Sequence, residues 1–374
     1  MAYDFIIIGA GIAGASAGYE LSRYGKTLLL EREDQPGYHS TGRSAAFFAE
    51  TYGNATVRAL TRGARPFFDS PPEGFSDTPL TNACGALHIA THDQSPCLES
   101  FHAELSDLSG IVERVPSDVL YAKCPALKPG LYTGGVWDPG AKEIDVHALH
   151  QGFLSGFRGR GGVLQTHADV DALNYDSGVW RVNAEGRTYE AACIINAAGA
   201  WADHVAALAD VPPLGLTPKR RTVITFDAPE GVNPEGWPLV IDVEERFYFK
   251  PEAGRLLASP ADETPMDPCD VQPDEIDVAT AAYRVEQATT LTIRRIVSKW
   301  AGLRSFFADK TPTLGFDQQA PGFFWLAGQG GYGIQTSPSL GRLAAALITG
   351  EGVPKDLQAL GVRAEALDPA RLKK

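Results

Sequence analysis

The sequence predicts an α/β protein in which a parallel sheet with its helices is interrupted by a second, mixed sheet. The first thirty residues alternate strand, glycine turn, helix and strand, and a second glycine-rich turn between strand and helix lies at residues 328–333. From about residue 71, proline and glycine become frequent and short strands replace that alternation. With 374 residues, of which 44% are hydrophobic, the chain is long enough for two domains.

The N-terminal segment has the clearest local pattern. Residues 3–8 are an isoleucine-rich apolar run, which predicts a buried parallel strand. Helical spacing of small residues follows as far as about residue 24, and we expect Gly25 to end that helix. Residues 26–30 predict a second strand, with Glu31 at its end.

The glycines of this segment carry a nucleotide-binding pattern. Gly9 suits a tight strand-to-helix turn, Gly11 lets the backbone approach a pyrophosphate, and Gly14 lets the helix lie close to the strand. Glu31 follows Gly9 by 22 residues, where an acid accepts hydrogen bonds from ribose hydroxyls. The segment therefore predicts a dinucleotide site of the Rossmann type, and Glu31 argues against the 2′-phosphate of NADP.

The remaining elements are expected in chain order. Residues 39–46 form a loop of small hydroxyl residues, glycine and arginine, which suits contact with a phosphate-bearing cofactor. We expect helices at residues 56–70, 145–157, 274–289 and 337–349, a turn at 311–315, and strands at 87–90, 135–137, 163–165, 170–173, 179–182, 188–191, 222–226, 239–243, 246–249, 255–259 and 322–327.

Composition excludes several classes of protein. The net charge is −13 and the densest basic run is only residues 219–221, so nucleic acid and anionic membranes are poor partners. No apolar run reaches the roughly 18 residues of a membrane span, and the N-terminus is a core strand and not a signal peptide. The five scattered cysteines suggest reduced thiols in the cytoplasm. His147 and His150 lack a third ligand, so no metal site is expected.

Seven segments, taken together and in this order, resemble the D-amino-acid oxidase superfamily of FAD enzymes. They are GAGIAGAS, LEREDQPGYHSTGRSAA, INAAGAWAD, LTPKRR, FYFKP, WAGLRSF and GQGGYGIQTS. Within the superfamily the bacterial D-amino acid dehydrogenases, such as D-arginine dehydrogenase, are the most similar. The resemblance implies a discontinuous Rossmann-type FAD-binding domain (residues 1–78, 143–208 and 300–374) and an inserted α+β substrate-binding domain with a mixed sheet (residues 79–142 and 209–299).

The resemblance also implies which residues bind FAD. The diphosphate lies on the first glycine turn, the adenosine end on the acid after the second strand, and the flavin above the second glycine turn. The implied residues are Gly9, Gly11, Ile12, Ala13, Gly14, Glu31, Arg32, Ser40, Thr41, Gly42, Arg43, Ser44, Val170, Ala198, Gly199, Trp201, Gly328, Gly330, Gly331, Tyr332, Gly333, Ile334 and Gln335. The helix after the second turn points its N-terminus at the flavin and stabilises negative charge on the reduced ring. The FAD is expected to be non-covalent, because no cysteine lies in these motifs.

A second implied set binds and positions the substrate. Arg304 and Arg221 match carboxylate-binding positions, where a guanidinium can form two parallel hydrogen bonds, and Tyr248 assists them. The carbonyl of Gly331 matches the acceptor for the amino group, and Tyr52 matches a tyrosine on a lid loop. Gln335 completes the implied active-site set.

The resemblance implies an FAD-dependent D-amino acid dehydrogenase. Hydride passes from the substrate Cα to flavin N5, the imino acid hydrolyses to a 2-oxo acid and ammonia, and positioning and electrostatics provide the catalysis. The electron acceptor is unknown, with a quinone or carrier favoured over O₂. The location is cytoplasmic or peripheral at the inner membrane. Three alternatives stay open: an O₂-using oxidase of glycine or N-methyl amino acids, an NAD enzyme, and a flavin-binding subunit without turnover of its own.

The side-chain pocket differs from that of D-arginine dehydrogenases. Those enzymes hold the guanidinium with an acid at the start of a substrate-domain strand, whereas residues 81–87 contain no acid here. Phe47, Phe48 and Ala49 replace more polar residues on the active-site loop. We therefore expect neutral, apolar side chains such as D-leucine, D-methionine or D-phenylalanine, unless Glu50 turns inward and restores the charge.

Overall fold

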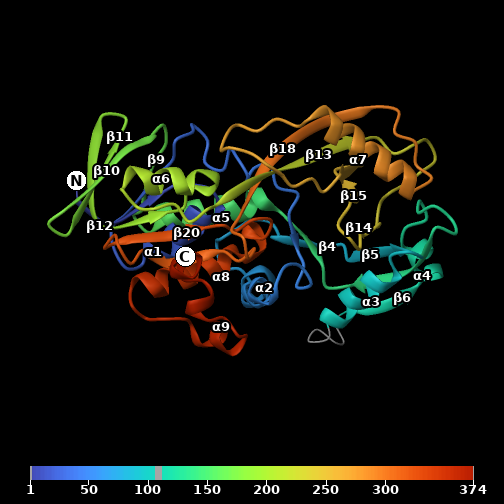
Figure 1. Ribbon diagram of the computed structural model, residues 1–374, viewed down its shortest axis with the longest axis horizontal. Coiled ribbons are helices and arrows are strands. Elements are labelled where there is room, and N and C mark those ends of the chain that lie inside the picture. Colours follow the sequence, from blue (N-terminus) through green and yellow to red (C-terminus); the bar gives the residue numbers. More distant parts are fainter. Residues whose placement is uncertain (1, 106–111, 374) are drawn as a thin grey trace.

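Two large β-sheets lie side by side along the length of the molecule in the computed structural model, which describes residues 2–105 and 112–373 (Figure 1). The first sheet has the strand order β10-β11-β12-β1-β2-β9, with β20 beside β12 and β19 beside β20. Its strands are β1 (Ala2–Ile8), β2 (Thr27–Leu30), β9 (Val163–Gln165), β10 (Val170–Asp176), β11 (Val179–Ala184), β12 (Arg187–Asn196), β19 (Thr313–Phe316) and β20 (Phe323–Ala327).

Helices cover both faces of the first sheet, as parallel strands require. Ile7 of β1 and Leu29 of β2 are buried beneath one group of helices: α1 (Ile12–Leu21), α2 (Ala55–Asp69), α5 (Val146–Gly159) and α8 (Gly333–Ile348). Ile6 and Ile8 point to the opposite face, where α6 (Ala202–Leu208) packs. The N-terminal ends of α1 and α8 both lie near the carboxyl ends of the strands, which is where nucleotides bind in such sheets.

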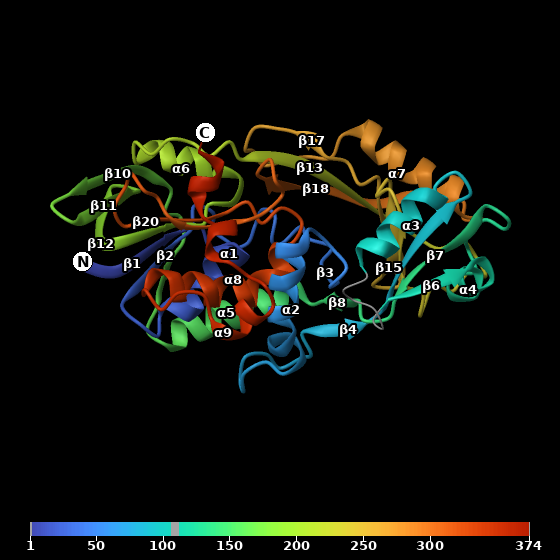
Figure 2. The same cartoon turned by 60° about the horizontal axis from the view of Figure 1, so that its bottom comes forward.

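The second sheet runs in the order β17-β13-β16-β15-β14-β5-β7-β6, with β18 paired to β13. Its core packs against α4 (Ser117–Lys123) and α7 (Glu275–Ala288), and α3 (Ser95–Glu104) covers β5 and β7 (Figure 2). Its strands are β5 (Ala86–Thr91), β6 (Glu113–Pro116), β7 (Tyr132–Asp138), β13 (Thr217–Phe226), β14 (Leu239–Asp242), β15 (Tyr248–Glu252), β16 (Arg255–Ser259), β17 (Thr264–Pro265) and β18 (Ile296–Phe306).

A small sheet connects the two lobes. It consists of β3 (Phe47–Phe48), β8 (Lys142–Ile144) and β4 (Thr81–Ala83) and lies between the large sheets (Figure 2). The predicted α/β class is thus confirmed. The first sheet has a parallel centre (β20, β12, β1, β2 and β9) with antiparallel strands β10, β11 and β19 at its edges, and the second sheet has mixed pairing. The domain boundaries stay a prediction; β18 begins before residue 300 and pairs with β13 along its length.

Three local expectations were wrong. Helix α1 ends at Leu21, and the backbone of Gly25 is not left-handed. A Cβ at Gly25 would lie 2.5 Å from Oδ2 of Asp4, so this close contact is what favours glycine there. The expected turn at residues 311–315 is largely the strand β19. Helix α8 begins at Gly333 and continues through Pro338, because the hydroxyl of Ser337 donates to the carbonyl of Ile334 that proline cannot satisfy.

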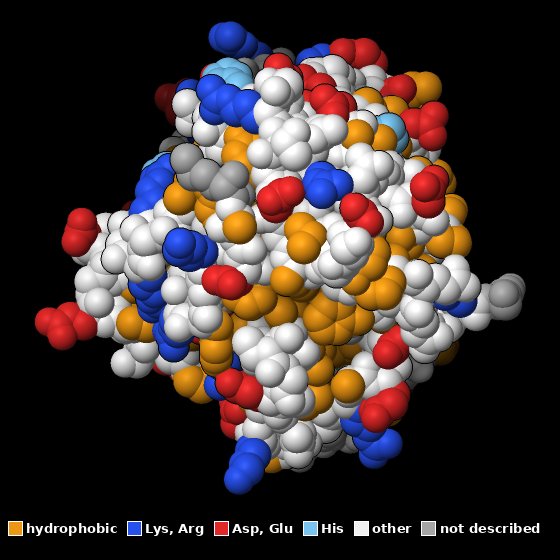
Figure 3. Space-filling view, turned by 90° about the vertical axis from the view of Figure 1, so that its left-hand side faces the viewer, with side chains coloured by type: hydrophobic (Ala, Val, Ile, Leu, Met, Phe, Trp, Pro, Cys, Tyr) orange, Lys and Arg blue, Asp and Glu red, His pale blue; other side chains and the backbone are white. Residues whose placement is uncertain are grey.

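The surface of the first lobe is mixed in character. On the end of the molecule where β10 and β11 lie, hydrophobic side chains gather near the middle and both signs of charge are scattered around them (Figure 3). Tyr175 and Val179, at the β10–β11 turn, are 42% and 36% exposed. Within the described ranges, no helix has the length and apolar character needed to cross a membrane.

Candidate active site

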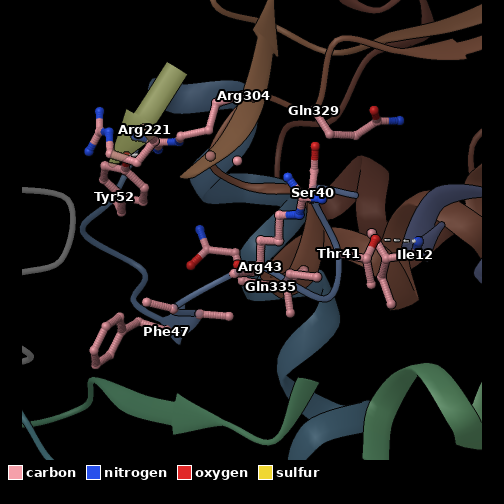
Figure 4. Close-up of a pocket in the computed structure, with 18 of the residues that line it drawn as sticks. Ile12, Ser40, Thr41, Arg43, Phe47, Tyr52, Arg221, Arg304, Gln329 and Gln335 are labelled. Atoms are coloured by element: carbon pink, nitrogen blue, oxygen red, sulfur yellow. Dashed lines mark hydrogen bonds between the residues drawn. The ribbon is translucent and has the colours of Figure 1, made fainter. Parts of the chain in front are cut away.

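The first glycine turn forms an anion-binding helix terminus. Gly9 has φ +100°, and a Cβ there would lie 2.6 Å from the carbonyl oxygen of Ala197, so only glycine fits between the two strands. At the start of α1 the amide of Ile12 donates to Oγ1 of Thr41 at 3.0 Å (Figure 4). The next two amides, of Ala13 and Gly14, have no hydrogen-bond acceptor in the described chain. Free amides and the helix dipole make this turn a site for phosphate.

A cavity of about 700 Å³ opens beside this turn and is lined by Gly9, Glu31, Arg32, Val170 and Trp201. Glu31 accepts hydrogen bonds from the amides of Ala10 (2.8 Å) and Glu33 (3.1 Å), so its carboxylate is fixed at the end of β2. The guanidinium of Arg32 lies 4.2 Å from the ring centre of Trp201. A fixed carboxylate beside a flat cationic–aromatic surface suits the ribose and base of a nucleotide.

A second cavity, of about 250 Å³, extends from the same turn to the second sheet. Figure 4 shows Thr41 and Ile12 at one side of it and Arg304, Arg221 and Tyr52 at the other. Some residues line both cavities and therefore mark their junction: Gly11, Ser40, Thr41, Ala197 and Gly199. The two cavities thus form one path past the free amides of α1, as an elongated dinucleotide requires.

The polar groups of this path fit FAD. Gln329 lines the second cavity, and its buried Nε2 has no hydrogen-bond partner among the described residues, so this donor is available to a polar ligand. Gly333, Ile334 and Gln335, the first turn of α8, line the same cavity, so the positive end of that helix faces the ligand. A buried donor and a helix N-terminus together suit the carbonyl oxygens of an isoalloxazine ring.

Arg304 is a cation to which the described residues supply no anionic partner. Among the described residues it forms no ion pair, and one Nη donates to the hydroxyl of Tyr52. A Cβ at Gly331 would lie 1.3 Å from its Nη2, so the guanidinium rests directly on that backbone. Burial acts to lower the pKa of Arg304, but the oxygens of Tyr52 and two further tyrosines act in the opposite direction and outweigh it. The pKa is therefore raised above its ordinary value, and the guanidinium stays charged. An unpaired, positioned guanidinium is suited to bind a ligand carboxylate.

Arg221 lies beside Arg304 on the neighbouring strand. Arg221 is paired with Gly302 across β13 and β18, one diagonal step from Arg304, and both arginines line the cavity. Unlike Arg304, Arg221 is partly neutralised: its Nε donates to the carbonyl of Asp262 at 2.9 Å, and Glu263 lies 3.5 Å from its Nη2. Arg221 therefore adds positive charge while being held in place.

The rest of the cavity wall that the second sheet provides is mostly apolar. Tyr248 on β15 follows them along the sheet, and the phenol lines the cavity. Ala86, Val223, Leu239 and Ile241 complete the apolar part of the wall. Residues 81–87, which include β4 and the start of β5, thus bring no acid to the cavity.

The loop at residues 49–52 is tied down at each of its four residues. The amide of Ala49 donates to Oε1 of Gln335 (3.1 Å), and the hydroxyl of Thr51 donates to Asp138 (3.1 Å). Glu50 is buried and its carboxylate accepts from Nε of Arg65 at 2.6 Å, pointing away from the cavity. The fourth contact is that of Tyr52 with Arg304. Glu50 therefore does not restore the missing charge.

Three residues differ from the sequence expectation: Phe48, Gln335 and Arg43. Phe47 lines the cavity, but Phe48 is buried on the other side, with its ring centre 5.2 Å from that of Phe68. Both the oxygen and the nitrogen of the Gln335 side-chain amide have protein partners, because Nε2 also donates to Thr61 at 2.9 Å. The guanidinium of Arg43 turns to Asp270 and the carbonyl of Val271, so only the rest of this residue faces the cavity.

The structure brings most of the expected residues to the two cavities. Gly14, Gly42, Gly328 and Tyr332 line neither cavity and support the turns and helix starts around them. Ala198 lines the first cavity, and Ser44, Gly330 and the six expected substrate residues line the second. The sequence did not indicate several lining residues: Tyr38, His88, His204 and Glu245. Their strand faces and loop positions depend on tertiary pairing.

His147 and His150 do not form a metal pair. His150 is buried on α5 and its Nε2 is 2.9 Å from the carbonyl of Ala10, which ties α5 to the first glycine turn. Burial lowers the pKa of His150, so the ring is neutral at physiological pH. Across the described residues, no three His, Cys, Asp or Glu side chains gather as a metal site.

Comparison with known proteins agrees with this geometry. A family model described as FAD dependent oxidoreductase matches residues 4–347. The uncharacterized oxidoreductase YurR of Bacillus subtilis is 24% identical over 379 residues, which cover 95% of this chain and 97% of YurR. Glycine oxidase of Geobacillus kaustophilus is 23% identical over 95% of both chains, and its crystal structure superposes with a TM-score of 0.80, covering 93% of this chain and 95% of that one. The crystal structure of L-proline dehydrogenase from P. horikoshii has a TM-score of 0.85 at 18% identity and covers 99% of this chain and 97% of its own.

Proposed function

Because the chain belongs to the family of FAD dependent oxidoreductases, we propose that it is a dehydrogenase of D-amino acids with neutral, apolar side chains. FAD is the cofactor, and when bound it supplies a two-electron acceptor for the hydride of the substrate Cα. The substrate amine becomes an imine as it loses that hydride and one proton. Hydrolysis of the imine by water then gives a 2-oxo acid and ammonia.

The observation that carries the proposal is the unpaired guanidinium of Arg304 at the end of the cavity. An α-amino acid presents a carboxylate, and Arg304 has uncommitted donors for it, with Arg221 and Tyr248 alongside. The carbonyl of Gly331, a residue whose Cα lies against Arg304, accepts a hydrogen bond from the substrate amine. These contacts fix the carboxylate and the amine of the substrate. The Cα–H bond is then held towards the flavin.

Support for the D configuration comes from the seven segments that resemble D-amino acid dehydrogenases. Support for an apolar side chain comes from the cavity wall, to which Ala86 and Leu239 bring no charged group. Of the described lining residues, Glu245 is the one acid, and it is exposed on the turn between β14 and β15, where water screens its charge. A substrate with a guanidinium or ammonium group on its side chain would bury that charge without a buried carboxylate to pair with it, so it should bind poorly.

The test is a comparison of kcat/KM for D-leucine, D-phenylalanine, D-lysine and D-arginine with one artificial electron acceptor. We expect the two apolar substrates to lead. A lead of tenfold or more for D-arginine would contradict the pocket argument, and Glu245→Gln would then show whether the exposed carboxylate binds the guanidinium.

A second candidate is an oxidase that passes its electrons to O₂ and acts on glycine or N-methyl amino acids. The match to glycine oxidase over 95% of both chains favours it. Stopped-flow reoxidation of the reduced enzyme in air separates the two functions. Slow reoxidation with fast transfer to a quinone supports the dehydrogenase, and fast reoxidation with peroxide formation supports the oxidase.

A further inference from the structure

One polar side chain interrupts the apolar wall of the cavity. His88 lies on β5, and in the register of the sheet it is paired with Ile241 of β14, just as Ala86 is paired with Leu239. All four line the cavity, whereas Leu87 and Ile89 point to the opposite face and enter the core. The direction of His88 is therefore set by the alternation of the strand.

The imidazole of His88 has no hydrogen-bond partner in the described protein. Its Nε2 is buried and unsatisfied, and its ring lies against Phe101 of α3, with ring centres 4.6 Å apart. Burial lowers the pKa of His88 to about 4, so the ring is uncharged at neutral pH and offers one donor and one acceptor. A buried polar group without a partner is costly, and a partner that arrives with a ligand removes that cost.

His88 lies where the end of a long substrate side chain would reach. Tyr248, Ile241 and His88 are neighbours across β15, β14 and β5. Two strand spacings separate the first from the last, which is roughly 10 Å. A substrate whose carboxylate lies by Arg304 and Tyr248 therefore directs a long side chain past Ile241 towards His88.

We propose that His88 determines substrate specificity by forming a hydrogen bond with an uncharged polar group at the end of the substrate side chain, such as a phenol hydroxyl or an indole N–H. This inference rests on the proposed function and refines it, because aromatic D-amino acids with a polar end should exceed purely apolar ones. A neutral imidazole offers no charge to compensate a buried guanidinium, ammonium or carboxylate, so charged ends stay excluded.

The experiment measures kcat/KM of the FAD-loaded enzyme for D-tyrosine, D-phenylalanine and D-leucine. In the wild-type protein we expect D-tyrosine to exceed D-phenylalanine by about fivefold, the effect of one neutral hydrogen bond. His88→Leu should reduce that ratio to about one, and His88→Gln, which keeps a donor and an acceptor, should restore part of it. The matched control is His92→Leu, an exposed histidine just beyond β5, which should leave the ratio unchanged.

Two results would overturn the role of His88: a wild-type ratio at or below one, or an unchanged ratio in His88→Leu. If His88→Leu does not fold, the wild-type ratio and the ratio of His88→Gln decide the question. Failure of the proposed function is distinguishable, because D-leucine and D-phenylalanine would then not be oxidised at all. Turnover of both with no preference for D-tyrosine overturns only the inference about His88.

Discussion

Replacing Arg304 by methionine removes the guanidinium while keeping a long stem in the same place. The structure gives the expected magnitude. No carboxylate of the described residues pairs with Arg304, so its free donors are available for two hydrogen bonds to a substrate carboxylate. At about 1.5 kcal/mol for each charge-assisted bond, the loss is about 3 kcal/mol, or roughly 150-fold in kcat/KM.

The flavin should remain bound in this variant, because the side chain of Arg304 contacts Tyr52 and the backbone of Gly331 and not the diphosphate turn. The assay is steady-state kcat/KM for D-leucine, with flavin content measured by absorbance after gel filtration. Lys299→Met is the matched control: it removes a cation from the same strand at a surface position, where Lys299 pairs with Glu275. A change of less than threefold in Arg304→Met would refute the carboxylate-binding role.

Three further predictions concern the cofactor and the effect of pH. Glu31→Ala should weaken FAD binding and leave kcat at saturating FAD nearly unchanged, because Glu31 holds the amides of Ala10 and Glu33 far from the substrate; retention of full flavin after dialysis would contradict it. Acid precipitation should leave the yellow colour in the supernatant, since none of the five cysteines lines either cavity; a yellow pellet would show a covalent bond. The pKa of His88 is about 4 when folded and about 6.5 when unfolded, so the unfolded chain takes up its proton first. The free energy of unfolding should therefore fall as the pH decreases from 6.5 to 4, and His88→Leu should show a smaller fall in urea titrations; an equal fall would contradict the burial of that ring.

The N-terminal half of the nucleotide site could be predicted from sequence because it is a local pattern. Gly9, Gly11 and Gly14 have their spacing fixed by one turn and one helix, and β1, α1 and β2 follow directly from periodicity. The predicted start of α8 was too late because proline is typical of the first turn of a helix, and Pro338 therefore favoured a start near residue 337. In the structure Pro338 lies inside the helix, where the hydroxyl of Ser337 donates to the carbonyl of Ile334 that proline leaves free.

The substrate end could be predicted only in part. Arg221, Tyr248 and Arg304 stand in segments that resemble known enzymes, and the structure brings them to one cavity. The direction of Glu50 could not be inferred from sequence, because it depends on Arg65 of α2, which lies 15 residues away. His88 gave no sequence signal, since whether it faces the cavity or the core depends on the register of β5 against β14.

The central claim is that this cavity oxidises D-amino acids with the bound flavin, and anaerobic reduction of that flavin tests it most directly. The purified FAD-containing protein is mixed without oxygen with D-leucine or D-phenylalanine, and in parallel with L-leucine, L-phenylalanine and glycine. We predict that the absorbance of the oxidised flavin disappears with the D-amino acids and persists with the other three. Persistence of the colour with every D-amino acid, together with bleaching by glycine or an L-amino acid, would contradict the claim.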